Sequence, residues 1–161
     1  MHPGYLAVAR ELGSIVAARG IRLVYGGGRV GLMGAVADAA LGAGGSVVGV
    51  IPQMLLDKEV GHEGLTELHV VETMSQRKWL MGELSDAFLT LPGGIGTMDE
   101  LFEAWPWTQL SIHDKPSGLL NFDGYYNPLI AFLDRAVEQG FLRPRHRAAL
   151  IGEQAIDKLL D

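Results

Sequence analysis

A glycine-rich stretch, Leu91–Glu100, carries the residue types best suited to chemistry. Its glycines, at positions 93, 94 and 96, let backbone N–H groups come close to a ligand, because glycine accepts positive φ angles and has no side chain. A helix that begins near Thr97 would add free N–H groups and the positive end of its dipole, which together suit a phosphate. Alternatively, Thr97 and Glu100 form a capping box in an ordinary strand-to-helix turn. This stretch alone leaves both interpretations open.

Glu100 suggests a specific reaction for such a phosphate site. A carboxylate one turn inside a phosphate-holding helix stands ~5 Å further along the ligand, where a ribose begins. Cleavage of an N-glycosidic bond passes through an oxocarbenium-like state, which a nearby carboxylate stabilises. Asp99 faces a different direction on the same helix, so we expect it in solvent or behind the site.

Two adjacent cations, Arg77 and Lys78, lie in a predicted helix that follows a strand. The simplest interpretation of such a pair is a solvated surface. At the carboxyl end of a parallel strand, however, a guanidinium can grip a carboxylate or phosphate through paired hydrogen bonds. Arg77 is therefore a second candidate for the ligand site, and the surface interpretation stays open beside it.

Strands and helices alternate along the chain, and most of the strands are apolar throughout. This pattern is typical of a parallel sheet with helices on both faces. We therefore predict a single α/β domain over residues 1–161, a Rossmann-like doubly wound parallel sheet flanked by helices. Pro106 is expected to kink or end the helix in which it lies. The expected strands cover residues 21–25, 46–51, 66–71, 86–91 and 117–121, and the expected helices cover 5–19, 30–41, 73–84, the segment after 97, 126–139 and one or two short pieces from 144.

Both glycine clusters, 26–34 and 93–97, directly follow predicted strands. Ligands of doubly wound sheets bind beyond the carboxyl ends of the strands, so the two clusters favour a nucleotide or phosphate site over plain turns. Sheets of this kind open with a strand, whereas this chain opens with a helix. The first strand is thus expected to be missing from this chain, and either to lie upstream of Met1 or to be replaced in another way.

Composition excludes several other functions. The chain has 161 residues, no cysteine and a net charge of −6. Disulfides, thiolate metal sites and a cysteine nucleophile are therefore excluded, and a nucleic-acid or anionic-membrane partner is disfavoured. The histidines lack metal-ligand spacing, so no metal site is expected. With neither a signal peptide nor ~20 consecutive apolar residues, a cytoplasmic location is expected.

Several motifs together resemble one known family. The stretch Pro92–Glu100 matches Pro-Gly-Gly-x-Gly-Thr-x-x-Glu, and Arg77 and Lys78 complete a Met-x-x-Arg-Lys helix. On these motifs the chain resembles the LOG (LONELY GUY) family of cytokinin riboside 5′-monophosphate phosphoribohydrolases, labelled in older schemes as lysine decarboxylases. The resemblance extends over Pro3–Ile151 and includes the supporting segments Val24–Gly28, Gly31–Gly34, Gly49–Pro52, Ile112–Pro116 and Leu120–Tyr126.

The resemblance implies hydrolysis of a nucleoside 5′-monophosphate, either AMP or an N6-prenylated AMP, to the free base and ribose 5-phosphate, without a metal or organic cofactor. It also implies a homodimer with the sites near its interface. Glu100 and Arg77 would form the catalytic pair. The implied contacts to the phosphate and to the rest of the substrate are Glu59, Lys78, Gly94, Ile95, Gly96, Thr97, Met98, Asp99, Gly27, Gly28 and Met33.

Two other functions remain open. A non-catalytic nucleotide or molybdenum-cofactor carrier on the same fold would need the glycine cradle, but it would not need both Glu100 and Arg77. Lysine decarboxylation requires pyridoxal phosphate on a Schiff-base lysine, and no lysine stands out for it. Two positions depart from the family pattern, with Ser75 in place of a histidine and Pro106 in place of a threonine. These departures are expected to affect substrate preference more than chemistry.

Overall fold

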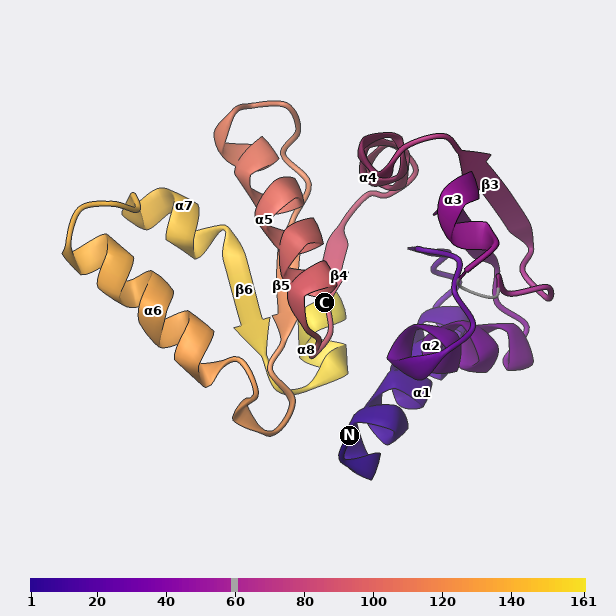
Figure 1. Cartoon of the computed structure of the whole chain (residues 1–161). Coiled ribbons are helices and arrows are strands. Elements are labelled where there is room, and N and C mark those ends of the chain that lie inside the picture. Colours follow the sequence, from indigo (N-terminus) through magenta and orange to yellow (C-terminus); the bar gives the residue numbers. More distant parts are fainter. Residues whose placement is uncertain (59–60) are drawn as a thin grey trace. The chain divides into compact units, whose positions relative to one another are not determined.

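The computed structural model describes residues 1–58 and 61–161, and the strands in them form two three-stranded parallel sheets (Figure 1). The chain divides into two compact units, Met1–Ser85 and Asp86–Asp161, with one sheet in each. The predicted α/β class with parallel strands is confirmed. One continuous sheet was expected, whereas the strands form two separate sheets. That residues 1–161 form a single domain stays a prediction. Within the described ranges, no helix is both long and apolar enough to cross a membrane.

In the first unit, a buried middle strand organises the packing. β2 (Val47–Pro52) pairs with β1 (Leu23–Tyr25) on one side and with β3 (Glu67–Val71) on the other. All six residues of β2 are buried, which is typical of a parallel strand shielded on both faces. The helices of this unit are α1 (Pro3–Ala18), α2 (Gly31–Gly42), α3 (Gln53–Leu56), which was not predicted, and α4 (Met74–Glu83).

Helices α1 and α2 pack closely because small residues lie at their contact. A Cβ added to Gly13 of α1 would overlap with the carbonyl oxygen of Val36 and would lie 2.8 Å from the Cβ of Ala39. On α2, Ala37 and Ala40 are 0% and 1% exposed. The two helices can therefore pack this closely only because residue 13 has no side chain.

In the second unit, β5 (Ser117–Leu120) is the central strand, with β4 (Phe88–Thr90) and β6 (Leu150–Glu153) on either side. The helices of this unit are α5 (Ile95–Gln109), α6 (Asn127–Glu138), α7 (Pro144–Ala148) and α8 (Ile156–Leu160), with a single 3-10 turn, η1 (Phe122–Gly124). Its hydrophobic core comprises the buried residues Leu101, Trp105, Leu119, Tyr126, Leu133 and Leu150.

Strand β6 was not predicted, because the expectation for the segment after residue 144 was short helices alone. Its residues pair in parallel with β5, and Leu150 lies opposite Ser117. Only the first of its four residues is buried. A strand that is short and mostly exposed lacks the apolar alternation from which a strand can be predicted.

The start of α5 differs from its prediction. The helix begins at Ile95, ahead of the expected Thr97, and Gly94 is its N-cap residue without a side-chain hydrogen bond. The predicted capping box of Thr97 and Glu100 is therefore wrong, because Thr97 already lies inside the first turn. Since no side chain caps the helix, its first N–H groups remain open to another partner.

Of the two outcomes expected at Pro106, an end of the helix is wrong, and a kink stays a prediction. The helix continues to Gln109, and the N–H of Leu110 donates to the carbonyl of Pro106 at 3.1 Å. A proline removes one helical hydrogen bond, here the one to the carbonyl of Phe102. The helix nevertheless continues for three residues beyond the proline.

Enlarging Gly13 tests the close contact between α1 and α2. We expect Gly13→Ala to lower the free energy of unfolding by about 1–3 kcal/mol, because the added methyl group must push α2 away. Gly42→Ala is the matched control, because an added Cβ there meets no atom within 4 Å, and its effect should be neutral or slightly stabilising. Urea denaturation measures both. Unchanged stability of the Gly13→Ala variant would contradict the packing.

Candidate functional site

The predicted glycine stretch lies where expected, at the carboxyl end of β4. The strand ends at Thr90, and α5 begins at Ile95. The first helical hydrogen bond runs from the N–H of Met98 to the carbonyl of Gly94 at 3.1 Å, so the N–H groups of residues 95–97 come before it. A Cβ added at Gly94 or Gly96 would meet no atom within 4 Å. These N–H groups therefore border open space, as anion binding requires.

Thr97 folds back over the glycine turn. A Cβ added to Gly93 would overlap with the hydroxyl oxygen of Thr97 and would lie 2.8 Å from its Cβ. Gly93 is thus required by the first turn of α5 itself. The motif glycines divide into one that admits a neighbouring side chain and two, Gly94 and Gly96, that leave the helix start uncovered.

Two tyrosines that were not predicted as site residues donate hydrogen bonds to the carbonyls of this turn. The hydroxyl of Tyr125 donates to the carbonyl of Gly93 at 2.7 Å, and the hydroxyl of Tyr126 donates to the carbonyl of Leu91 at 2.5 Å. Burial raises the pKa of Tyr126 well above its usual range, so its hydroxyl stays protonated and can donate at neutral pH. The sequence pointed to them only indirectly, because both lie in the segment 120–126 that resembles the family.

In the first unit, Arg77 lies at the carboxyl ends of the strands. It is 9% exposed, so the solvated-surface interpretation is wrong for this residue. Its Nε donates to the carbonyl of Val50 in β2 at 3.0 Å, and its Nη2 donates to the carbonyl of Gly26, directly after β1, at 2.6 Å. Helix α4 presents it there, and the side chain of Thr73 caps that helix in a capping box with Gln76.

The charge of Arg77 has no anionic partner among the described residues. Its partners there are two backbone carbonyls and the sulfur of Met74, 3.9 Å from Nη1. Burying a cation without an anion costs free energy. A bound phosphate or carboxylate would supply the missing negative charge.

The turn after β1 is held in place from several directions. Gly27 has a φ of +78°, and its carbonyl accepts the N–H of His62 at 3.0 Å. The hydroxyl of Tyr25 donates to the carbonyl of Gly28 at 2.7 Å. Because the N–H of Gly64 donates to Nδ1 of His62, the proton of the neutral ring lies on Nε2, which donates to Asp38 at 2.7 Å.

The structure brings the predicted residues together in two sets, one in each unit. Arg77 shares its set with the turn at residues 26–28, and Glu100 lies half-buried in the second turn of α5, after the open N–H groups of the first turn. Glu59 lies outside the described residues. For the remaining predicted contacts, Lys78 is half-buried on α4, Met33 is 40% exposed on α2, Asp99 is exposed, and Met98 packs against the core of the second unit.

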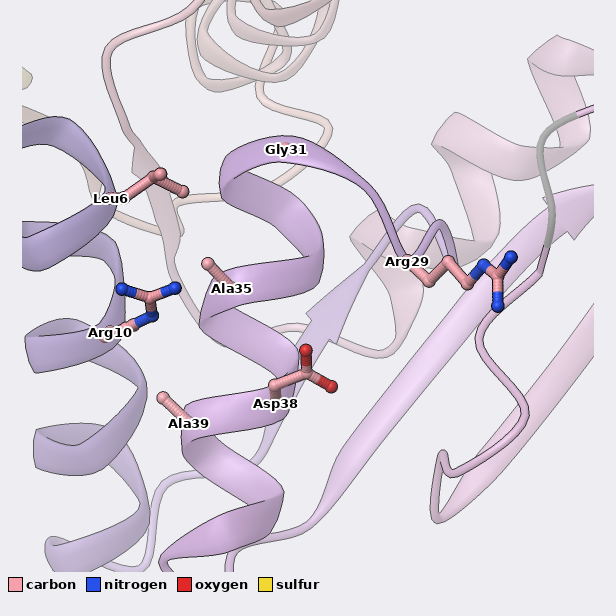
Figure 2. A pocket seen from close by; sticks show the side chains of 7 residues that line it. All are labelled: Leu6, Arg10, Arg29, Gly31, Ala35, Asp38 and Ala39. Carbon is pink, nitrogen blue, oxygen red and sulfur yellow. The ribbon is translucent and has the colours of Figure 1, made fainter. Parts of the chain in front are cut away.

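A groove of about 420 Å³ lies elsewhere on the first unit, beside α1 and α2 (Figure 2). Figure 2 shows Arg10 pointing from α1 toward α2, whereas Arg29 extends away from it on the other side of α2. The two cations therefore do not converge on one ligand. The groove contains none of the predicted site residues; it is lined by Leu6, Arg10, Arg29, Gly31, Ala35, Asp38 and Ala39.

In the part of the chain that the structure describes, no group of three or more acidic or histidine side chains is placed to hold a metal ion. The chemistry of both sets is instead that of backbone N–H groups, one guanidinium and one carboxylate. Parallel strands, helices between them and glycine turns at the strand ends define a Rossmann-like α/β protein.

Comparison with known proteins shows the family. The model of the family described as "Possible lysine decarboxylase" matches residues 33–161. A relative from Oryza sativa subsp. japonica, named "Probable cytokinin riboside 5′-monophosphate phosphoribohydrolase LOGL2", is 54% identical over 147 residues, which cover 91% of this chain and 60% of the relative. The cytokinin riboside 5′-monophosphate phosphoribohydrolase of Rhodococcoides fascians is 51% identical over 148 residues, 91% of this chain and 75% of that protein. The chain belongs to this family, as its motifs predicted.

A solved structure shows the same fold. The molybdenum cofactor carrier protein of Chlamydomonas reinhardtii matches with a TM-score of 0.72 over 98% of this chain and 84% of that one. The two sequences are 20% identical. At that identity the likeness concerns the fold alone, and function has to be argued from the site.

A double-mutant cycle tests the contact between Gly93 and Thr97. We expect Gly93→Ala to destabilise the chain by about 1–3 kcal/mol, because the methyl group overlaps with the Thr97 side chain. Thr97→Ala removes the hydroxyl and one methyl, so the double variant should recover part of that loss. Urea denaturation of all four proteins gives the coupling free energy. Strictly additive effects would show that the two positions do not touch.

Proposed function

We propose that the chain hydrolyses the N-glycosidic bond of cytokinin riboside 5′-monophosphates, and of AMP, to release the adenine-type base and ribose 5-phosphate. The observation that carries this proposal is the uncapped start of α5 with Glu100 one turn inside it. Two relatives above 50% identity bear the corresponding name, although the chain spans only 60% of the length of the first. The cytoplasmic location expected from composition stays a prediction.

In the proposed reaction, the N–H groups of residues 95–97 and the positive end of the α5 dipole hold the 5′-phosphate. The bond between C1′ and the base nitrogen breaks, and its electron pair leaves with the base. Glu100 stabilises the positive charge that develops on the ribose. A water oxygen then bonds to C1′, and the proton that this water loses ends on the base.

Arg77 is proposed as the second catalytic residue because its buried charge has only neutral protein partners among the described residues. An anionic substrate would compensate that charge, and the two carbonyls would hold the guanidinium in one orientation. The wider nucleotide contacts are proposed from the family resemblance, and they comprise Lys78, Gly27, Gly28, Met33, Met98, Asp99 and Glu59.

A homodimer with the sites near its interface is also part of the proposal. Three large apolar side chains on or directly after α5 are exposed: Ile95 at 90%, Phe102 at 42% and Leu110 at 70%. Their spacing of seven and eight residues places them on one side of the helix. Exposed apolar patches often mark protein–protein contacts. Because Ile95 is also a proposed phosphate contact, such an interface would lie next to the site.

Glu100→Gln tests the proposed reaction directly. We expect the rate of base release from AMP and from isopentenyladenosine monophosphate to fall at least about 100-fold, because the amide cannot stabilise the developing charge. Glu103→Gln, the same change further along α5, should retain the activity. Chromatography of the free base gives the rates, and calorimetry gives nucleotide affinity. Full activity of the Glu100→Gln variant would refute the role of this carboxylate, and nucleotide binding without base release by the unmodified chain would favour a carrier.

Gly26→Ala tests whether activity depends on where the Arg77 guanidinium lies. A Cβ at residue 26 would overlap with Nη2 of Arg77, so the flexible end of that side chain must move. We expect the rate of base release to fall by about 10–100-fold. Adding Gly26→Ala to Arg77→Ala should then cost nothing further, because both changes act through one group. Independent, multiplying losses would contradict this coupling.

A further inference from the structure

Two carbonyls at the start of the glycine turn accept hydrogen bonds from tyrosine hydroxyls. Tyr126 donates to the carbonyl of Leu91 and Tyr125 to the carbonyl of Gly93, at 2.5 and 2.7 Å. Both tyrosines follow η1, in a segment far from the glycine stretch in sequence but within the same unit. The residues directly before and after Pro92 therefore each have a carbonyl that is bonded to a tyrosine hydroxyl.

These hydrogen bonds determine the direction of a backbone N–H group. In a trans peptide, the carbonyl and the N–H of the same plane point in opposite directions. The carbonyl of Gly93 and the N–H of Gly94 share one plane, and no peptide bond in the described residues is cis. Because the carbonyl points to Tyr125, the N–H of Gly94 points away from it. The Tyr125 hydroxyl therefore orients the N–H that precedes the open turn of α5.

The tyrosines are themselves held by the core of the second unit. Tyr126 is 3% exposed, its N–H donates to the side chain of Asn121 at 2.7 Å, and Asn121 in turn donates to Asn127 at 2.8 Å. The ring of Tyr125 packs edge-on against that of Tyr126, with centroids 5.0 Å apart. Tyr125 is 42% exposed, whereas its hydroxyl is hydrogen-bonded to the turn.

We propose that Tyr125 and Tyr126 are positioning residues, which hold the glycine turn so that its N–H groups face the phosphate of the substrate. This inference rests on the proposed function for the identity of the ligand. It assigns to the two hydroxyls an effect on phosphate affinity that acts through the backbone of residues 91–94. Neither tyrosine touches the reacting atoms in this assignment.

Tyr125→Phe separates this role from a structural one. We expect ribose 5-phosphate to bind about fivefold more weakly, the effect of losing one hydrogen bond. KM for AMP should rise by the same factor with kcat nearly unchanged, because the chemistry at C1′ is not affected. Adenosine, which lacks the phosphate, should inhibit with unchanged affinity, and the unfolding temperature should stay the same. Tyr5→Phe in α1 is the control and should leave ribose 5-phosphate affinity and KM unchanged.

Calorimetry with ribose 5-phosphate, inhibition by adenosine and thermal unfolding decide the outcome. Unchanged ribose 5-phosphate affinity in the Tyr125→Phe variant overturns the proposal. A loss of affinity that comes with a lowered unfolding temperature, or that extends equally to adenosine, overturns it as well. If the unmodified chain releases no base but binds ribose 5-phosphate in a Tyr125-dependent way, the proposed function fails while this inference stands. Failure of the unmodified chain to bind ribose 5-phosphate overturns this inference.

Discussion

Side-chain donors occupy the backbone carbonyls at the carboxyl ends of the strands, and the candidate site depends on this arrangement. In the first unit Arg77 donates to two such carbonyls, and in the second unit Tyr125 and Tyr126 donate to one each. A strand end that leaves its sheet has polar groups that must be satisfied. Because the protein supplies donors for these carbonyls, the N–H groups of the glycine turn and of the α5 start remain for a ligand.

This arrangement explains why the glycines of the two turns are not equivalent. Gly26 and Gly93 each make room for a neighbouring side chain, Arg77 in one case and Thr97 in the other. A Cβ added to Gly94 would meet no atom within 4 Å, so its lack of a side chain leaves the start of α5 accessible to a ligand. Some glycines of such a loop therefore allow a neighbouring side chain to pack closely, and others leave backbone N–H groups accessible.

The fold class and the position of the glycine motif follow from sequence patterns. Apolar strands between amphipathic helices predicted the parallel α/β fold, and the glycine motif was correctly placed after a strand. The error at Thr97 arose because a capping-box pattern and a helix interior can have the same residues, and only the backbone bond from Met98 to Gly94 distinguishes them. The roles of Tyr125 and Tyr126 could not be predicted, because their partners are carbonyls 32 and 35 residues away in the sequence. Contacts over such separations produce no periodic pattern in the sequence.

The molybdenum cofactor carriers share this fold at about 20% identity, so the fold does not distinguish a carrier from a hydrolase and the side chains must. The carbonyl bonds of Arg77 use two of its donor nitrogens without neutralising its charge. A lysine carries its three donors on a single nitrogen, so it lacks the separate, rigidly spaced donor nitrogens with which Arg77 bonds the two carbonyls. The same residue can therefore join two strand ends and still attract an anion. That double use explains how a buried, structurally bonded guanidinium remains suited to a nucleotide site.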